Sequence, residues 1–312
     1  MTTAHAYGKV ILFGEHAVVY GQPAIAVPVT QVRATALVDG AHPDDGVTIL
    51  APDLNLVHRL GSPAQTDEAR PLELTVRNAL DRIGVPRAQD LRIEVSSTIP
   101  IARGMGSGAA IATAMVRALG SHFDAGLAAS DVSELVYQTE ILHHGTPSGI
   151  DNSVIAFEKP VYFVRGEGPK VFEVGCPFSL VIADTGVPSP TRDVVADVRR
   201  AWELDRERYD RLFEEMGALA RAAKDAITTG RLDGLGCLMN RNQALLEEIA
   251  VSSPEVERFV AAAREAGAEG AKLSGAGRGG NVIALISPSA RDEVSGALRS
   301  AGAVRVMATR VE

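Results

Sequence analysis

The spacing of hydrophobic residues in the first hundred positions predicts mostly β-strands. Residues 8–29 contain two apolar runs separated by Gly14, which predicts a strand, a turn and a second strand interrupted by proline. Residues 71–84 instead place apolar side chains three or four positions apart, so we expect a helix that ends at Gly84. Alternating patterns with β-branched residues predict further strands at 31–39, 46–51 and 91–101.

Two helices are expected in the next fifty residues. Residues 102–119 begin with a glycine-rich turn and continue as a helix that is apolar on every face, which is typical of a buried helix. Residues 131–145 form a second helix, with Ser130 or Asp131 as its N-cap and Gly145 at its end. Backbone N–H groups at the glycine-rich turn, together with the positive end of the helix dipole, make the first helix a candidate anion site.

The second half of the chain combines strands with longer helices. Residues 176–186 form an apolar run typical of a buried strand. Residues 193–230 repeat apolar side chains every three or four positions, which predicts one long amphipathic helical stretch. Ser253 followed by Pro254 is a typical helix start. Further helices are expected at 232–249 and 290–300, and further strands at 271–274, 281–287 and 303–311.

This order of elements indicates an α+β fold in a chain of 312 residues, which is long enough for two domains. We place the boundary near residue 175, giving domains of residues 1–175 and 176–312. The hydrophobic content of 46% is that of a globular protein, and the net charge of −8 argues against nucleic-acid binding.

The N-terminal residues, the apolar runs and the cysteines indicate the compartment and whether the protein associates with a membrane. Residues 1–5 lack the layout of a signal peptide, and no uninterrupted apolar run approaches the ~18 residues of a membrane span. Cys176 and Cys237 lie far apart and form no C-x-x-C pattern, which indicates a reducing compartment without a disulfide framework or a cysteine zinc site. We therefore expect a soluble, cytoplasmic protein.

Two glycine loops fit the G-x-G-x-x-[GA] pattern, at residues 104–109 and 275–280. A dinucleotide site would need a helix and then a strand that ends in an acidic residue, and neither loop is followed by that order. The phosphate-binding pattern G-x-x-x-x-G-K-[ST] is also absent from the sequence. The second loop is an ordinary hairpin turn or an anion contact, and the neighbouring Lys272 and Arg278 favour the anion contact.

A third candidate pairs Glu140 with Asp151, 11 residues further along the chain. By spacing alone, Glu140 is a solvated helix residue and Asp151 a turn former, with a functional role as the alternative for each. No H-E-x-x-H or G-x-S-x-G pattern is present, so zinc protease and serine hydrolase chemistry have little support.

Several motifs together resemble the GHMP kinase superfamily. They are "GKVILFGEHAVVYGQPAIAVPV", the phosphate loop "PIARGMGSGAA" and the C-terminal loop "KLSGAGRGGNVIAL". Within the superfamily, "GEHAVVYG", "EILHHGTPSGIDN" and "DTGVPSPTRDVV" are similar to the mevalonate kinase family, and the matches span residues 8 to 284. The resemblance implies an N-terminal domain like domain 2 of ribosomal protein S5 and a ferredoxin-like C-terminal domain.

The resemblance also implies roles for single residues. Asp151 and Lys9 would be catalytic, and Glu140 with Ser107 would hold Mg²⁺. Residues that would help bind or orient the substrate are Glu15, His16 and Thr191. Residues that would bind the ATP phosphates are Arg103, Gly104, Met105, Gly106, Ser107, Gly108, Ala109, Gly275 and Gly277.

The implied reaction is ATP-dependent phosphorylation of the 5-hydroxyl of mevalonate, in isoprenoid precursor synthesis. The alternatives are phosphomevalonate kinase or another GHMP-type small-molecule kinase, or a non-catalytic nucleotide-binding sensor. The expected partners are ATP and mevalonate, with no nucleic acid and no membrane, and a homodimer is left open.

Two positions depart from the family pattern. The family loop commonly carries two serines, whereas here Ser107 is followed by Gly108. Either Ser107 or water would complete the Mg²⁺ shell, unless Gly108 is needed for its backbone conformation. Asn281 stands where the family often has cysteine.

Overall fold

The chain divides into two compact units in a computed structural model that describes residues 1–63, 66–100, 103–144, 147–189 and 191–312, apart from the side chains of residues 143 and 144. The first unit comprises residues 1–8, 32–100 and 106–158. The second comprises residues 9–31, 101–105 and 159–312. No single point in the sequence separates the two units, because strands β1 (Thr2–Phe13) and β2 (Ala24–Gly40) each contribute to both. The boundary near residue 175 stays a prediction about separately folding domains.

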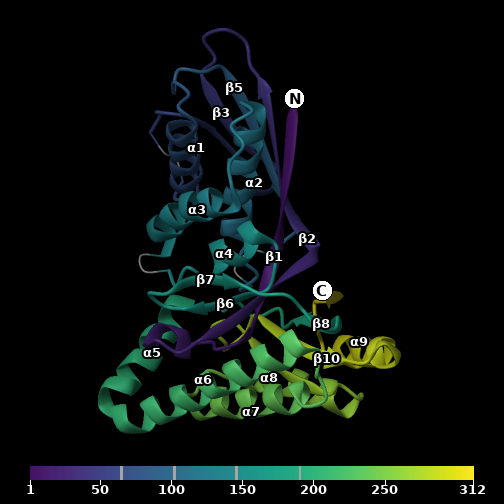
Figure 1. Cartoon of the computed structure of the whole chain (residues 1–312). Coiled ribbons are helices and arrows are strands. Elements are labelled where there is room, and N and C mark those ends of the chain that lie inside the picture. Colours follow the sequence, from purple (N-terminus) through teal and green to yellow (C-terminus); the bar gives the residue numbers. More distant parts are fainter. Residues whose placement is uncertain (64–65, 101–102, 145–146, 190) are drawn as a thin grey trace. The chain divides into compact units, whose positions relative to one another are not determined.

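The sheet of the first unit is built on the C-terminal part of β2 (Figure 1). This part pairs antiparallel with β5 (Leu91–Ser97), and β5 pairs in parallel with β3 (Val47–Ala51). β3 then pairs antiparallel with β4 (Leu56–Arg59), and the turn between them is the short 3₁₀ helix η2 (Pro52–Leu54). Alternate residues are buried in this C-terminal part of β2, as the period of two in the sequence predicted.

Four α-helices are present in the described part of the first unit. They are α1 (Ala69–Ile83), α2 (Ser107–His122), α3 (Ala129–His144) and α4 (Ile150–Phe157). The predicted end of α1 is confirmed, because Gly84 has a φ of 78° and its N–H donates to the carbonyl of Asp81 at 3.2 Å. α2 is buried along most of its length, as its all-round apolar pattern predicted. α2, α3 and α4 pack against one another.

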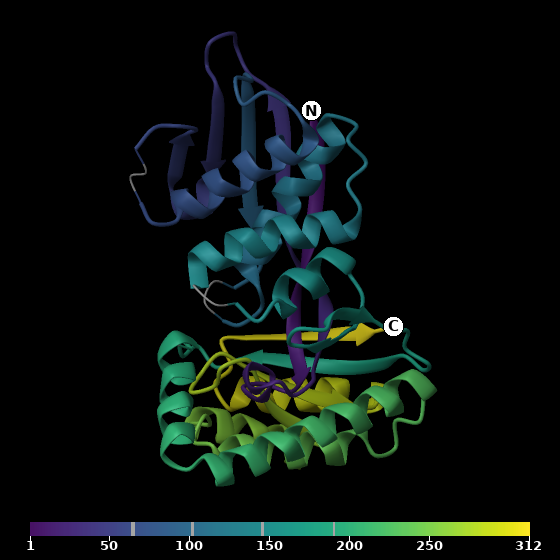
Figure 2. The ribbon, with the colours of Figure 1, turned by 60° about the vertical axis from the view of Figure 1, so that its left-hand side comes forward.

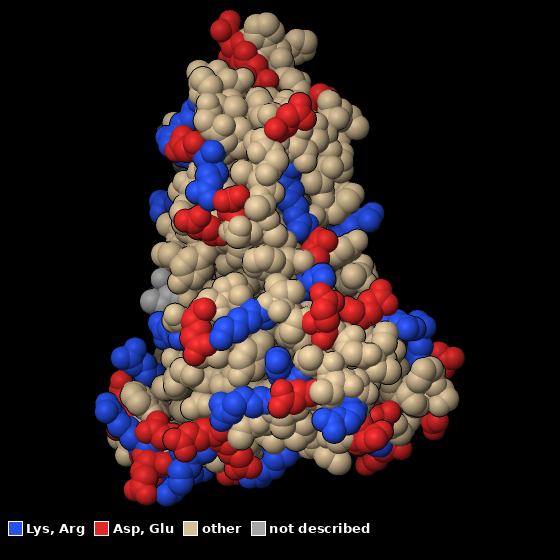
Figure 3. Space-filling model, in the orientation of Figure 1, with Lys and Arg blue, Asp and Glu red and all other residues tan. Residues whose placement is uncertain are grey.

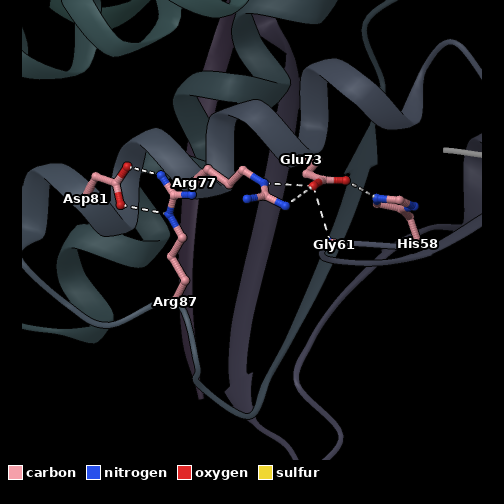
Figure 4. Close-up of polar contacts among 6 residues, drawn as sticks. All are labelled: His58, Gly61, Glu73, Arg77, Asp81 and Arg87. Carbon is pink, nitrogen blue, oxygen red and sulfur yellow. Dashed lines mark hydrogen bonds and ion pairs between the residues drawn. The ribbon is translucent and has the colours of Figure 1, made fainter. Parts of the chain in front are cut away.

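An ion-pair cluster joins β4 to α1 (Figure 4). Glu73 of α1 accepts hydrogen bonds from Nε2 of buried His58, at 2.5 Å, and from Nε of Arg77, at 2.7 Å. The backbone N–H of Gly61 also donates to Glu73, at 3.3 Å. The cluster therefore fixes the hairpin that precedes α1 to the helix itself.

The C-terminal sheet of the second unit has four antiparallel strands in the order β11-β8-β10-β9. The strands are β8 (Phe178–Asp184), β9 (Gly270–Ser274), β10 (Asn281–Ile286) and β11 (Arg305–Val311). With helices after β8 and after β10, this is the β-α-β-β-α-β order of a ferredoxin-like fold. The expected ferredoxin-like C-terminal part is confirmed.

Helices of the second unit cover one side of this sheet (Figure 2). The predicted helical stretch over 193–230 is confirmed except at Asp205, which ends one helix and caps the next by accepting the N–H of Arg208. The prediction of an N-cap at Ser253 is confirmed, since its hydroxyl accepts the N–H of Val256 at 3.4 Å. The helices are α5 (Thr191–Leu204), α6 (Arg206–Thr229), α7 (Leu235–Glu248), α8 (Pro254–Glu265), the short η3 (Pro288–Ala290) and α9 (Arg291–Ser300).

Shorter elements that the sequence pattern did not predict complete this unit. A 3₁₀ helix, η1 (Ala17–Tyr20), lies between β1 and β2. The N-terminal part of β2 pairs with β6 (Val161–Val164), which pairs with β7 (Gly168–Val171).

On the face drawn in Figure 3, basic and acidic side chains are interspersed. No helix among the described residues is long and apolar enough to cross a membrane.

Candidate active site

The N-terminus of α2, where the sequence predicts an anion site, lies in the first unit. Gly106 has a φ of 71°, which favours glycine, and its carbonyl accepts the N–H of Ala110 at 2.9 Å. Ser107 is the first helical residue, and the N-cap residue Gly106 has no side chain that could cap the N–H groups of this turn. Such N–H groups and the helix dipole favour an anion. The motif residues at 101–102, 145–146 and 190 lie outside the described part of the chain.

Glu140 of α3 lies beside this turn. Its side chain is buried, and a Cβ built on Gly108 would lie 3.5 Å from its Oε1 atom. Gly108 is inside α2 and is not among the glycines with positive φ, so its backbone conformation does not require glycine. The interpretation of Glu140 as a solvated helix residue is therefore wrong.

Asp151 lies in the first turn of α4 rather than in a turn outside a helix. The chain begins this helix at Gly149, whose carbonyl accepts the hydroxyl of Ser153 at 2.6 Å. Asn152 fixes α4 to α3 by donating to the hydroxyl of Ser133 at 2.9 Å. The first turn of a helix favours a negative side chain. Because α2, α3 and α4 pack together, the first unit places Ser107, Glu140 and Asp151 on adjacent helices.

The donor set of this unit fits Mg²⁺ bound together with a nucleotide. No group of three or more His, Cys, Asp or Glu side chains that could hold a metal ion occurs among the described residues. Mg²⁺, however, is usually bound through one or two carboxylates, several waters and substrate phosphates. A buried carboxylate beside a helix N-terminus meets that requirement.

The second unit contains the predicted residues of the N-terminal motif. Lys9 lies on β1 with 3% of its surface exposed, and its backbone N–H donates to the carbonyl of Met105 at 3.1 Å. Glu15 and His16 follow in the turn after β1, and both are buried. Glu15 forms a buried ion pair with Lys272 of β9.

His16 has an unusual backbone conformation, with φ of 61° and ψ of −50°. The N–H of Ala17 reaches back to the carbonyl of Glu15 at 2.6 Å, so residues 15–17 form a γ-turn of the rare positive-φ kind. Nε2 of His16 lies 2.8 Å from the carbonyl of Ala276 and donates to it. Burial lowers the pKa of His16 to about 4, so the ring is neutral at physiological pH.

The loop after β9 is a compact turn between two strands. Gly277 has a φ of 87°, and a Cβ there would lie 2.0 Å from the carbonyl oxygen of Val251. Both neighbouring cations have protein partners: Lys272 pairs with Glu15, and Arg278 pairs with Asp197 and with the carbonyl of Ala250. The argument that these two cations favour anion contact is therefore not supported, although Gly275 and Gly277 stay candidates for phosphate binding.

Thr191 begins α5 and is exposed. The segment before it is held against the glycine loop. Ser189 donates to the carbonyl of Gly277 at 2.7 Å, and Thr185 donates to that of Gly280 at 2.9 Å. The motif at 184–195 and the C-terminal glycine loop, which are distant in sequence, thus lie side by side within this unit.

The sequence did not identify the residues that hold Arg103. Asp184, at the end of β8, forms an ion pair with the Arg103 guanidinium at 3.4 Å. Asn281, which received no role, donates its side-chain amide to the Arg103 carbonyl. Nη1 of Arg103 is buried and has no hydrogen-bond partner among the described residues. The one available signal was the position of Asp184 and Asn281 inside recognised motifs.

Comparisons with known proteins agree with this arrangement. The family model of the GHMP kinases N terminal domain matches residues 72–159, and that of the GHMP kinases C terminal matches residues 216–304. A mevalonate kinase of Pyrococcus abyssi is 35% identical, over 100% of this chain and 96% of that protein. A mevalonate kinase of Thermococcus sibiricus is 34% identical, over 97% of this chain and 94% of that protein.

Solved structures show the same similarity. The crystal structure of Methanococcus jannaschii mevalonate kinase has a TM-score of 0.86 at 25% identity, over 99% of this chain and 98% of that chain. The structure of L. major mevalonate kinase in complex with R-mevalonate has a TM-score of 0.83 at 29% identity, over 100% of this chain and 96% of that chain. The chain therefore belongs to the GHMP kinases and, within them, to the mevalonate kinases.

Proposed function

We propose that the protein transfers the γ-phosphoryl group of ATP to the 5-hydroxyl of mevalonate, as a step of isoprenoid precursor synthesis. The observation that carries this proposal is the full-length similarity to mevalonate kinases, together with the presence of Lys9, Glu140 and Asp151 in matching motifs. A non-catalytic nucleotide sensor would have no need to keep this set. A phosphomevalonate kinase of Streptococcus pneumoniae shares the fold at 14% identity, which supports no common substrate.

In the proposed mechanism, the first unit supplies the base and the metal site. The N–H groups at the start of α2 bind phosphate oxygens, and the dipole of α2 adds to this stabilisation. Asp151 accepts the proton of the attacking hydroxyl, a contribution of about 10²–10⁴-fold. Glu140 and Ser107 would hold Mg²⁺, which neutralises phosphate charge when bound.

Residues of the other motifs supply the remaining groups. Lys9 stabilises the charge on the attacking oxygen, and Arg103, Gly104, Met105, Gly275 and Gly277 contact the nucleotide phosphates. Glu15, His16 and Thr191 orient mevalonate. Because His16 is neutral and donates through Nε2, its Nδ1 atom is an acceptor for a substrate hydroxyl. Phosphoryl transfer depends mainly on this kind of positioning and charge neutralisation.

An assay that couples ADP release to a spectroscopic signal tests the proposal. The purified chain is incubated with ATP, Mg²⁺ and one acceptor at a time: mevalonate, phosphomevalonate, galactose or homoserine. We expect turnover with mevalonate alone, and the product is identified as 5-phosphomevalonate by mass spectrometry. Faster turnover with any other acceptor, or none with mevalonate, would refute the assignment.

Location and assembly complete the proposal. A cytoplasmic location is supported by two exposed free cysteines, Cys176 and Cys237, which are typical of a reducing compartment. The proposed homodimer is tested by sedimentation equilibrium of the full chain.

Limited proteolysis near residue 175 tests the two-domain division, since a flexible boundary there would yield two stable fragments.

A further inference from the structure

Lys272 is a buried cation for which the proposed mechanism has no role. It lies on β9 with 0% of its surface exposed, and Glu15, which lies 257 positions earlier, is 1% exposed. The Lys272 ammonium donates to Oε1 of Glu15 and, at 2.6 Å, to the carbonyl of Leu273. Oε2 of Glu15 has no hydrogen-bond partner among the described residues.

Each member of this pair depends on the other for its charge. Burial raises the pKa of Glu15, and Lys272 opposes that effect, with a smaller contribution from Lys9. Burial likewise lowers the pKa of Lys272, and Glu15 opposes it. The charged groups that act on Glu15 are thus Lys272 from β9 and Lys9 from β1. Without Lys272, burial would favour the protonated form of Glu15 more strongly.

The pair belongs to a set of contacts between the turn after β1 and the strand and loop at 272–276. Ser274 accepts the N–H of Ile11 at 3.0 Å and donates to its carbonyl at 2.9 Å. His16 donates to Ala276 in the same loop. A backbone like that of His16 is strained and persists only where its surroundings fix it. The Glu15–Lys272 pair, at the residue next to His16, is one of these constraints.

A purely structural role explains this pair poorly. Buried ion pairs contribute little net stability, and apolar residues of similar size are often as stable in their place. Glu15 instead directly precedes His16 and is acted on by the charge of Lys9, and Lys272 lies three residues before Gly275. The proposed function uses Lys9, His16 and Gly275.

We propose that Lys272 is a positioning residue for phosphoryl transfer. By holding Glu15 ionised and in place, it fixes the turn that carries His16 against the C-terminal glycine loop. The inference rests on the proposed function, because it assigns an effect on turnover to a residue that touches no substrate.

Four variants test the inference: Lys272→Met, Glu15→Gln, the double variant of both, and Arg264→Met as a control. Arg264 of α8 donates to the carbonyl of Ala271 at 2.8 Å, so the control perturbs β9 beside Lys272 without touching Glu15. For each, kcat and both KM values are measured as a function of pH, and the melting temperature is recorded.

We expect Lys272→Met to lower kcat by about 10²-fold at neutral pH, the loss typical of misplaced groups. Its kcat should recover as the pH rises, because Glu15 then loses its proton. The double variant should have a low kcat without this rise and should be as active as Glu15→Gln alone. Arg264→Met should lower the melting temperature while keeping the wild-type pH profile.

Two results would overturn the inference. The first is a Lys272→Met enzyme that melts earlier but keeps the wild-type kcat and pH profile. The second result applies if Lys272→Met does not fold. The double variant, which leaves no lone buried charge, is then measured instead, and a wild-type kcat of this variant would overturn the inference. Failure of the proposed function is seen separately, as a wild-type enzyme inactive on mevalonate, and the inference would fall with it.

Discussion

At Ser107 and Gly108 this chain departs from the family pattern of two serines. The structure excludes the explanation that Gly108 is needed for its backbone conformation, so either Ser107 or water would complete the Mg²⁺ shell. Since Gly108 has an ordinary helical conformation, Gly108→Ser should fold, with its Cβ in van der Waals contact with Glu140. If Ser107 supplies the hydroxyl contact, Ser107→Ala should lower kcat by about 10²–10³-fold. If water does so, Ser107→Ala should have little effect and Gly108→Ser should be neutral or mildly activating. Steady-state kinetics and melting temperatures of both variants distinguish the two explanations. A fully active Ser107→Ala enzyme would exclude Ser107 as the source of the hydroxyl contact.

Asp151 gives a second prediction at the residue scale. Asp151→Asn removes the proposed base but leaves the N-terminus of α2 unchanged, so kcat should fall by at least ~10²-fold while ATP affinity stays nearly constant. Calorimetric titration with ATP and steady-state kinetics measure the two effects. Asn152→Ala is a useful comparison, because it loosens α4 from α3 without removing the carboxylate. Near-normal turnover of Asp151→Asn would exclude Asp151 as the base.

At the scale of elements, the Glu73 cluster joins β4 to α1 and makes stability depend on pH (Figure 4). Burial raises the pKa of Glu73, but hydrogen bonds from His58 and Arg77 outweigh it and hold that pKa below its ordinary value. A lowered carboxyl pKa stabilises the fold above the ordinary value of 4.5, and this stabilisation is lost as the pH falls through the lower folded pKa.

Glu73→Gln should therefore lower the free energy of unfolding by about 1–3 kcal/mol at neutral pH, the usual effect of leaving the buried partner in a polar network, here His58, without its acceptor. The difference from wild type should shrink as the pH falls below the ordinary carboxyl range. Urea unfolding at several pH values measures it. Glu94→Gln, at an exposed ion pair with Arg92, is the control and should change stability by at most about 0.5 kcal/mol. A Glu73→Gln effect that does not vary with pH would contradict this account.

At the scale of the whole molecule, nucleotide binding should stabilise the folded chain. ATP with Mg²⁺ at one hundred times its dissociation constant should add about 2.7 kcal/mol. In Glu140→Gln one anionic ligand is lost, so more Mg²⁺ should be needed to reach the same rise in melting temperature. Thermal unfolding across a Mg²⁺ titration at constant ATP tests this without measuring turnover. An identical titration in wild type and Glu140→Gln would show that Glu140 does not hold the metal.

Local signals in the sequence were sufficient for most elements. Gly84 and Ser253 were correctly predicted as helix ends, because capping depends on residues within one turn. The break at Asp205 was missed because the apolar period continues from Trp202 to Tyr209 across it. α4 was missed because the Pro-Ser-Gly stretch before it is typical of a turn, whereas the buried Ile150 and Val154 form its packed face.

For the site, residue types in ordered motifs were enough to predict the family, the phosphate loop and the acidic residues, since a reaction of this kind needs those groups. Tertiary structure alone decided what surrounds them. Lys272 and Arg278 were expected to favour an anion contact at the glycine loop, yet each faces a carboxylate that is distant in sequence. Asn281 holds Arg103, and Glu140 lies beside Gly108, through contacts that no local pattern encodes. The physical reason is that burial and charge pairing depend on neighbours in space, whereas caps and periodicities depend on neighbours in sequence.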